Sequence, residues 1–233
     1  MIIRKNSHYT QNIRKMNKII IVDDHSLFRE GMKLLIENEG LGEVIGEAEN
    51  GKEFLDLLET HDPDLVIMDI EMPVMGGLEA TKKGLKMRPG LKILVLTMLN
   101  EKANYVEMTN AGVYGFVLKT SGKQEFEKAI NAINQGESYF SNELLRQIIY
   151  NINSTSESRI KRTDSNEEKL TAREKEVMQC FCEGLTVSEI AAKLFVSIKT
   201  IETHRSSLLR KTNSKNTINL VLYAIRNKLV LIH

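Results

Sequence analysis

The sequence predicts an α/β domain with a doubly wound, parallel five-stranded sheet, followed by a small all-α domain that contains a helix-turn-helix. In the first part of the chain, short apolar runs alternate with amphipathic stretches, which is the pattern of β-α-β units. The last part has a series of helical patterns that includes a short helix followed by a longer, polar-faced one. A length of 233 residues suits two domains. The composition, 42% hydrophobic and 27% charged, excludes collagen-like, fully disordered and disulfide-framework proteins.

The expected elements follow from the hydrophobic pattern. The strands are expected at residues 19–22, 44–48, 65–68, 93–96 and 115–118. Between and after them, one-sided apolar patterns predict helices at residues 27–36, 54–58, 78–85, 103–108 and 126–133. In the last part, Thr171 and Glu174 have the spacing of a capping box at the start of a helix. Further helices are expected at residues 187–194, 198–211 and 217–227.

Composition and charge suggest four segments. Residues 1–17 are a basic extension that we expect to be disordered, residues 18–150 form the α/β domain with a trailing helix, residues 151–168 are a flexible linker, and residues 169–233 form the helical domain. The α/β segment has 14 basic and 22 acidic residues, a net charge of −8, whereas residues 169–233 have 11 and 5, a net charge of +6. A basic domain of this kind suits a polyanion such as nucleic acid.

The sequence also bears on compartment and redox chemistry. No apolar run approaches the roughly 18–20 residues that span a bilayer, so we expect no membrane segment. No export signal is recognisable at the start, and a cytoplasmic protein is expected. Cys180 and Cys182 are too close for an unstrained disulfide and lack a second ligand pair for zinc, so we interpret them as small core residues.

Polar residues follow four of the expected strands. Asp23 and Asp24 end the first, Asp69 the third, Thr97 the fourth and Lys119 the fifth. Ligands of such sheets bind beyond the carboxyl ends of the strands, so these residues are expected to share one pocket if the four strands are neighbours. Each acid alone has an ordinary alternative role, as a helix N-cap or a turn residue. Three converging carboxylates instead require a cation, and oxygen ligands favour Mg²⁺.

Such a pocket is suited to phosphoryl transfer. Asp69 is the candidate nucleophile, forming an acyl phosphate, while Lys119 would pair with one phosphoryl oxygen and Thr97 would donate to another. A P-loop-like match at residues 46–53 is a weaker candidate for phosphate binding, because Glu53 replaces the Ser or Thr that binds Mg²⁺ and nearby acids would repel a nucleotide.

The first domain resembles the receiver domain of two-component response regulators. The motifs are Val22-Asp23-Asp24-His25, Met68-Asp69-Ile70-Glu71-Met72-Pro73, Leu96-Thr97 and Phe116-Val117-Leu118-Lys119. The resemblance implies a flavodoxin-like fold with Asp69 as phosphoacceptor. It also implies a Mg²⁺ site formed by Asp23, Asp24, Asp69 and the Glu71 backbone carbonyl, and a conformational switch through Thr97 and Phe116.

In the second domain, the pattern alone fits a helix-turn-helix and a generic small helical bundle with a solvated basic face equally well. If it is a helix-turn-helix, the expected helix at residues 198–211 is the candidate DNA reader. By helical geometry Ile198, Ile201, Leu208 and Leu209 face the core. The same geometry makes Glu202, Thr203 and Ser206 base-reading candidates, with Glu202 able to accept from cytosine N4 and the Thr203 methyl able to meet thymine. Phosphate contacts are assigned to Lys199, His204, Arg210 and Lys211, with a purely structural role left open for His204.

The motifs Leu170-Thr171-x-Arg173-Glu174, Glu189-Ile190-Ala191 and Ser197-x-Lys199-Thr200-Ile201-x-Thr203-His204 resemble the LuxR-type helix-turn-helix. With the receiver-like domain they are similar to the NarL/FixJ class. The resemblance implies a dimer on double-stranded promoter DNA, paired through the last helix, for which we name Leu220, Val221 and Ala224.

The function expected from this resemblance is that of a transcription factor. A sensor histidine kinase would phosphorylate Asp69, and the altered receiver would control promoter binding, with RNA polymerase as a further candidate partner. No enzyme activity is expected beyond self-phosphotransfer and autodephosphorylation. Inhibition by domain contact and promotion of dimerisation both remain open as control mechanisms. Two rival functions also remain open, a Mg²⁺-dependent phosphatase with Asp69 as nucleophile and a DNA-binding protein with an inert receiver.

Overall fold

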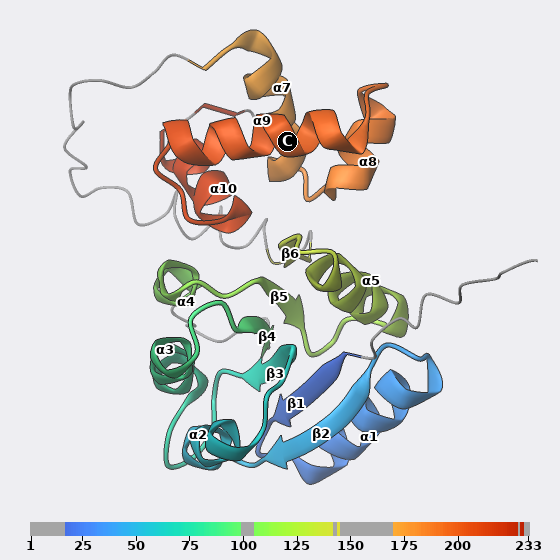
Figure 1. Ribbon diagram of the computed structural model, residues 1–233, viewed down its shortest axis with the longest axis vertical. Helices are drawn as coiled ribbons and strands as arrows, with labels where there is room; N and C mark the ends of the chain where they lie inside the picture. The colour runs from blue at the N-terminus through green and yellow to red at the C-terminus, as the bar shows by residue number, and fades with distance from the viewer. Residues whose placement is uncertain (1–16, 99–104, 142–143, 145–169, 228, 231–233) are drawn as a thin grey trace, which may run out of the picture.

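The computed structural model describes residues 17–98, 105–141, 144, 170–227 and 229–230 (Figure 1). These residues form an α/β domain and a helical domain, coloured blue to olive and orange to red in the figure. The predicted N-terminal extension, apart from Asn17, lies outside the described residues. So do the linker at residues 151–168 and residues 145–150 of the predicted trailing helix.

The α/β domain is built on a parallel sheet. Its strands are β1 (Lys18–Val22), β2 (Glu43–Ala48), β3 (Leu65–Asp69), β4 (Lys92–Thr97), β5 (Gly115–Leu118) and β6 (Tyr139–Phe140). The order β2-β1-β3-β4-β5-β6 makes the four strands with polar ends consecutive neighbours, as the predicted pocket requires. The predicted count of five strands was one short, because β6 has only two residues and pairs at the edge through Tyr139 and Phe140.

Helices cover both faces of the sheet. They are α1 (Ser26–Asn38), α2 (Gly51–Thr60), α3 (Gly77–Met87), α4 (Tyr105–Ala111) and α5 (Lys123–Asn134). Alternate residues of each strand point to opposite faces. Ile19 and Ile21 of β1 therefore join a core with α1 and α5. Ile20 and Val22 face the other way and join a core with residues of α2, α3 and α4.

The helical domain comprises α7 (Ala172–Cys182), α8 (Val187–Lys193), α9 (Ile198–Lys211) and α10 (Thr217–Arg226). Thr171 and Glu174 form the predicted capping box at the start of α7. Cys180 and Cys182 are buried and free, as expected for core residues. The prediction for Ile198 was wrong: its side chain is 52% exposed, because it begins α9 beyond the edge of the core that encloses Ile201 and Leu208.

The two domains touch through α4, the segment between α5 and β6, α8 and α10. The Asn219 amide on α10 donates to Asn110 Oδ1 on α4 at 3.3 Å, and the Asn216 amide donates to the Val113 carbonyl at 3.3 Å. The Val187 N–H at the start of α8 donates to Glu137 Oε2, after α5, at 3.4 Å. The last helix of the helical domain thus rests on the α4 side of the α/β domain.

Within the described ranges, no helix has both the length and the apolar character needed to span a bilayer.

Candidate functional site

Asp69 lies at the carboxyl end of β3, near the middle of the sheet, and its side chain is almost completely buried. The Ile70 N–H donates to Asp69 Oδ1 at 2.8 Å, and the Lys119 ammonium donates to Oδ2 at 2.7 Å. The sheet order places β1 on one side of β3 and β4 on the other. The residues that end these neighbouring strands can therefore reach the same carboxylate.

Lys119 bridges two of the carboxylates. Its Nζ lies 2.7 Å from Asp69 Oδ2 and 2.9 Å from Asp23 Oδ2, and its side chain is only 11% exposed. Burial by itself would lower the pKa of Lys119, but the hydrogen bonds with Asp69 and Asp23 outweigh it and raise the pKa. Lys119 is therefore a permanent cation at the site, suited to neutralising an oxygen of a transferred phosphoryl group.

Burial raises the pKa of Asp69, the phosphoacceptor candidate, whereas it tends to lower that of Lys119. Loss of hydration raises the pKa of Asp69 to about 6, although Lys119 and the Ile70 N–H favour the charged form. Asp69 is consequently a carboxylate at neutral pH, with more basic oxygens than an ordinary aspartate. That combination suits a nucleophile.

A potential metal site adjoins Asp69. Ligand atoms of Asp23, Asp24, His25 and Asp69 lie within 4.8 Å of one another. The alternative reading of the first two acids as helix caps is not supported, since His25 is the N-cap residue of α1 and its side chain makes no capping bond. Three carboxylates at this spacing fit a hard divalent ion such as Mg²⁺, which prefers oxygen ligands.

Sequence reasoning missed two residues that organise this acidic cluster. The His25 N–H donates to Asp23 Oδ1 at 2.9 Å, and its Nδ1 lies 2.9 Å from Asp24 Oδ1. Arg29 on α1 is buried and donates to the Asp23 backbone carbonyl at 2.5 Å and to Glu49 Oε1 at 2.9 Å. An arginine in an amphipathic helix looks solvent-exposed in sequence, so no local signal marked it.

Thr97 and Phe116 are both fully buried, and they are linked by a residue that the sequence analysis did not select. The Thr97 hydroxyl lies 3.2 Å from the Tyr105 hydroxyl on α4. The Tyr105 ring packs edge-on against Phe116 at 5.7 Å between centroids, and Phe116 stacks on Phe140 at 5.5 Å. This row connects the strand ends at the site to α4, the helix that touches α10.

The loop after Asp69 is tightly fitted. A Cβ at Gly77 would lie 2.0 Å from the Asp69 carbonyl oxygen, so only glycine fits there. The Gly77 N–H donates to the Ile70 carbonyl at 2.9 Å, which closes the loop. Glu71 lies exposed within it. In the P-loop-like segment, the Asn50 side chain accepts from the N–H groups of Lys52 and Glu53, so these two donors are already engaged.

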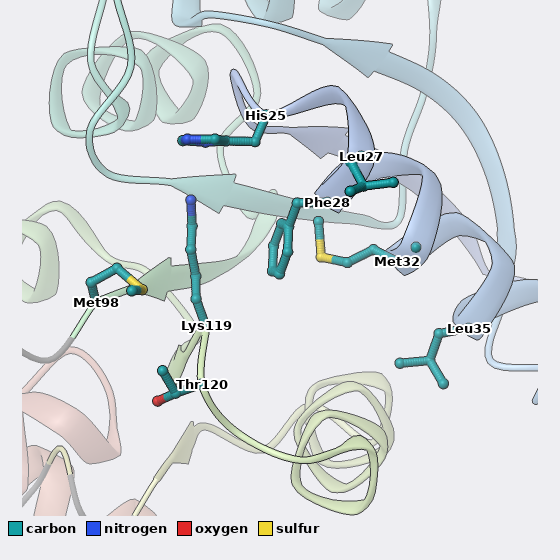
Figure 2. Close-up of a pocket in the computed structure, with 9 residues that line it drawn as sticks. His25, Leu27, Phe28, Met32, Leu35, Met98, Lys119 and Thr120 are labelled. Atoms are coloured by element: carbon teal, nitrogen blue, oxygen red, sulfur yellow. The ribbon is translucent and has the colours of Figure 1, made fainter.

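An apolar groove opens beside the acidic site (Figure 2). It has a volume of about 740 Å³ and is bounded by α1 on one side and by the ends of β4 and β5 on the other. Its lining residues are His25, Leu27, Phe28, Gly31, Met32, Leu35, Met98, Lys119 and Thr120. Leu27 is 81% exposed at its rim. A contiguous apolar groove, in contrast to a single exposed apolar side chain, is typical of a binding surface.

In the helical domain, the predicted base readers lie on the exposed side of α9. Glu202, Thr203 and Ser206 are all exposed. The hydroxyls of Thr203 and Ser206 donate to backbone carbonyls one turn earlier, those of Lys199 and Glu202, each at 2.9 Å. Of the predicted phosphate contacts, Lys199 and Arg210 are exposed and His204 is half-buried.

The structure corrects the role given to Lys211. Its Nζ lies 2.9 Å from Glu174 Oε2, and its side chain is only 12% exposed. Glu174 also accepts from Ser207 Oγ at 2.7 Å. Lys211 therefore ties α9 to α7 inside the domain instead of facing a phosphate. The helical pattern placed it correctly on α9, but its partner comes from 37 residues away.

The residues named for a dimer interface, Leu220, Val221 and Ala224, are all at most 2% exposed. They belong to the core, and α10 contacts α7, α9 and α4 of the same chain. In this conformation these three side chains are covered by their own chain, so pairing through them requires α10 to change its contacts.

Comparison with known proteins assigns both domains. Residues 19–131 match the family described as "Response regulator receiver domain", and residues 168–224 match "Bacterial regulatory proteins, luxR family". The oxygen regulatory protein NreC of Staphylococcus epidermidis is 33% identical, over 91% of this chain and 99% of its own. The transcriptional regulatory protein LiaR of Bacillus subtilis is also 33% identical, over 92% of this chain and all of its own.

Solved structures agree with this assignment. The RcsB response regulator of Salmonella typhimurium has 29% identity and a TM-score of 0.55, over 89% of this chain and 97% of its own. A second structure, described as a two-component response regulator RcsB-DNA complex, has a TM-score of 0.54 with the same identity and coverage. The chain described here is therefore a two-component response regulator of the NarL/FixJ class, with a receiver domain and a LuxR-type DNA-binding domain.

Proposed function

We propose that phosphorylation of Asp69 by a sensor histidine kinase controls how tightly this regulator binds promoter DNA. The observation that carries the proposal is the nearly buried Asp69 carboxylate, in contact with Lys119 and adjoining Asp23 and Asp24. A carboxylate oxygen of Asp69 attacks phosphorus, and the bond from phosphorus to the donor breaks. Lys119 then pairs with one phosphoryl oxygen, and Thr97 turns its hydroxyl from Tyr105 towards another.

Magnesium is the proposed cofactor, held by Asp23, Asp24, Asp69 and the Glu71 carbonyl. When bound, Mg²⁺ supplies positive charge that offsets the charge of the phosphoryl oxygens. The chain's own contribution is the spacing of the acids, which the hydrogen bonds from His25 and Arg29 to Asp23 maintain.

Mass spectrometry tests the phosphoacceptor. We expect the full-length protein, incubated with acetyl phosphate and Mg²⁺, to gain the mass of one phosphoryl group on the peptide that contains Asp69. Asp69→Asn should gain none, and Lys119→Ala should gain it much more slowly. Labelling of a different peptide, or equal labelling of Asp69→Asn, would refute the assignment.

The groove supports the kinase as phosphodonor, because it shares Lys119 with the acceptor site and Leu27 presents an exposed apolar side chain at its rim. We expect Leu27→Ala to reduce phosphotransfer from a purified histidine kinase by about tenfold, which corresponds to about 1.4 kcal/mol, near the lower end of the range for burying one Leu side chain. Labelling by acetyl phosphate should be unchanged. Leu34→Ala is the matched control, since Leu34 is exposed on α1 and does not line the groove. Equal losses with both phosphodonors would contradict this docking.

On the DNA side, α9 is the proposed recognition helix, with base contacts from Glu202, Thr203 and Ser206 and phosphate contacts from Lys199, His204 and Arg210. A homodimer on two half-sites and contact with RNA polymerase complete the proposed assembly. The docking of α10 on α4 supports control through domain contact, since a change in α4 would release the helix proposed for pairing.

A further inference from the structure

Two large apolar side chains are exposed at the start of α9. Phe195, in the turn between α8 and α9, is 95% exposed, and Ile198, the first residue of α9, is 52% exposed. Phe195 also has a positive φ of 54°, a backbone conformation that bulky residues rarely adopt. Burial of Phe195 therefore contributes almost nothing to the stability of the free domain, and about half of Ile198 remains available for contact. Strained residues of this kind concentrate at functional sites.

Their position places them at the leading end of the recognition helix. A helix-turn-helix inserts the N-terminal part of its second helix into the major groove. Ile198 begins this helix, and Glu202 lies one turn further along on the same side. A side chain on this side, next to Glu202, is therefore within reach of base edges.

The polar groups nearby are already partly engaged within α9. The hydroxyl hydrogens of Thr203 and Ser206 are donated to the helix backbone, and Glu202 lies 3.5 Å from the Lys199 ammonium. The apolar part of this surface is formed by Ile198, Phe195 and the Thr203 methyl, and it lies beside the exposed side chains of Lys199 and Glu202. The thymine 5-methyl group is the apolar feature of the major groove.

We propose that Ile198 is a sequence-determining residue that contacts the 5-methyl group of thymine in the major groove, with Phe195 extending the same apolar edge. This inference rests on the proposed function of α9 as the recognition helix. Duplex DNA is favoured over a protein as the partner because Lys199, next to Ile198, is 87% exposed, and because residues 169–233 have a net charge of +6. A cationic group beside the apolar edge matches a polyanion that presents methyl groups.

The test uses DNA that lacks only the methyl group. The full-length protein, treated with acetyl phosphate and Mg²⁺, is first used to select a binding duplex from a randomised double-stranded library. Each thymine of that duplex is then replaced by deoxyuridine, and affinities are measured. We expect replacement at one position in each half-site to weaken wild-type binding about fourfold per methyl contact. Ile198→Ala should bind the thymine duplex with the affinity that wild type has for the deoxyuridine duplex, and should not distinguish the two.

Matched variants separate the explanations. Thr203→Ser removes the other methyl group but keeps the hydroxyl, and it should retain sensitivity to deoxyuridine at the Ile198 position. Phe195→Ala should weaken binding to the selected duplex, and Leu34→Ala in the receiver domain should leave it unchanged. Circular dichroism establishes that each variant is folded.

Several results would overturn the inference. One is an Ile198→Ala variant that still distinguishes thymine from deoxyuridine as wild type does. Another is the loss of that sensitivity in Thr203→Ser alone. A third is that Phe195→Ala and Ile198→Ala bind DNA normally but no longer support transcription by added RNA polymerase. That result would mean that the apolar edge formed by Ile198 and Phe195 contacts a protein partner. Failure of the wild type to select any duplex would instead refute the proposed DNA-binding function of α9.

Discussion

The carboxylate of Asp69 is subject to opposing influences. Burial raises its pKa to about 6, while the Lys119 ammonium and the Ile70 N–H stabilise the charged form. Sequence identified Asp69 and Lys119, because both follow strands and the residue types suit phosphoryl transfer. It could not identify His25, Arg29 or Tyr105, since their roles depend on contacts made only after folding.

The raised pKa predicts a pH dependence. Only the ionised carboxylate is a nucleophile, so the rate of labelling by acetyl phosphate should rise as pH increases from 5 to 7. Added Mg²⁺ favours the charged form and should move the midpoint to lower pH. Initial rates measured by mass spectrometry check this, with Asp69→Asn as the background. A rate that is flat over this range at every Mg²⁺ concentration would contradict it.

The close packing around Gly77 predicts that a larger side chain there destabilises the protein. Gly77→Ala would bring a methyl group against the Asp69 carbonyl, and we expect a loss of about 1–3 kcal/mol in the free energy of unfolding, with slower phosphorylation. Gly31→Ala on α1 is the matched control. Its Cβ would meet nothing within 4 Å, so it should stabilise the helix by up to about 1 kcal/mol. Denaturant unfolding of both variants gives the comparison, and equal effects would refute the steric argument.

At the scale of elements, hydrophobic periodicity located the five main strands and the capped helices close to their observed bounds. The short strand β6 escaped because two residues carry no periodic pattern. Ile198 and Lys211 show a second limit of prediction from sequence. Helical geometry predicts the direction of a side chain around its axis, but it does not show where the neighbouring helices end or which partner is in reach.

Glu174 joins α7 to α9, and its environment predicts acid sensitivity of the DNA-binding domain. Burial alone would raise its pKa, but bonds from Thr171, Lys211 and Ser207 lower it to about 2. Because the folded pKa is below the unfolded value, the stabilisation is present above about pH 4.5 and is lost as pH falls towards 2.

Glu174→Gln should therefore destabilise this domain by about 2 kcal/mol at pH 7, the order expected for hydrogen bonds to a charged group. The difference from wild type should shrink as pH is lowered from 5 to 3. Urea unfolding monitored by circular dichroism at several pH values measures it. A difference that stays constant with pH would show that the charge of Glu174 has no part in the stabilisation.

At the scale of the whole molecule, α4 connects the two domains. Its first residue, Tyr105, contacts Thr97 and Phe116, and near its end Asn110 accepts from Asn219 on α10. The sequence indicated two domains of opposite charge, but not that they touch, because contacts between surfaces leave no periodic signal. This arrangement favours domain contact as the restraint on the unphosphorylated protein.

Asn110→Ala tests the restraint from the receiver side, without changing the DNA-binding domain. We expect the unphosphorylated variant to bind the selected duplex about two- to fivefold more tightly, as the loss of one exposed hydrogen bond allows. Lys83→Ala, an exposed change on α3, should have no effect. Unchanged affinity in Asn110→Ala would favour phosphorylation-driven dimerisation as the means of control.

The most direct measurement of the central claim is a DNA titration of wild type and Asp69→Asn, each before and after treatment with acetyl phosphate and Mg²⁺. Our account predicts that treatment tightens the binding of wild type and leaves Asp69→Asn unchanged. Equal affinities for all four samples would mean that chemistry at Asp69 does not reach α9, and would contradict the account.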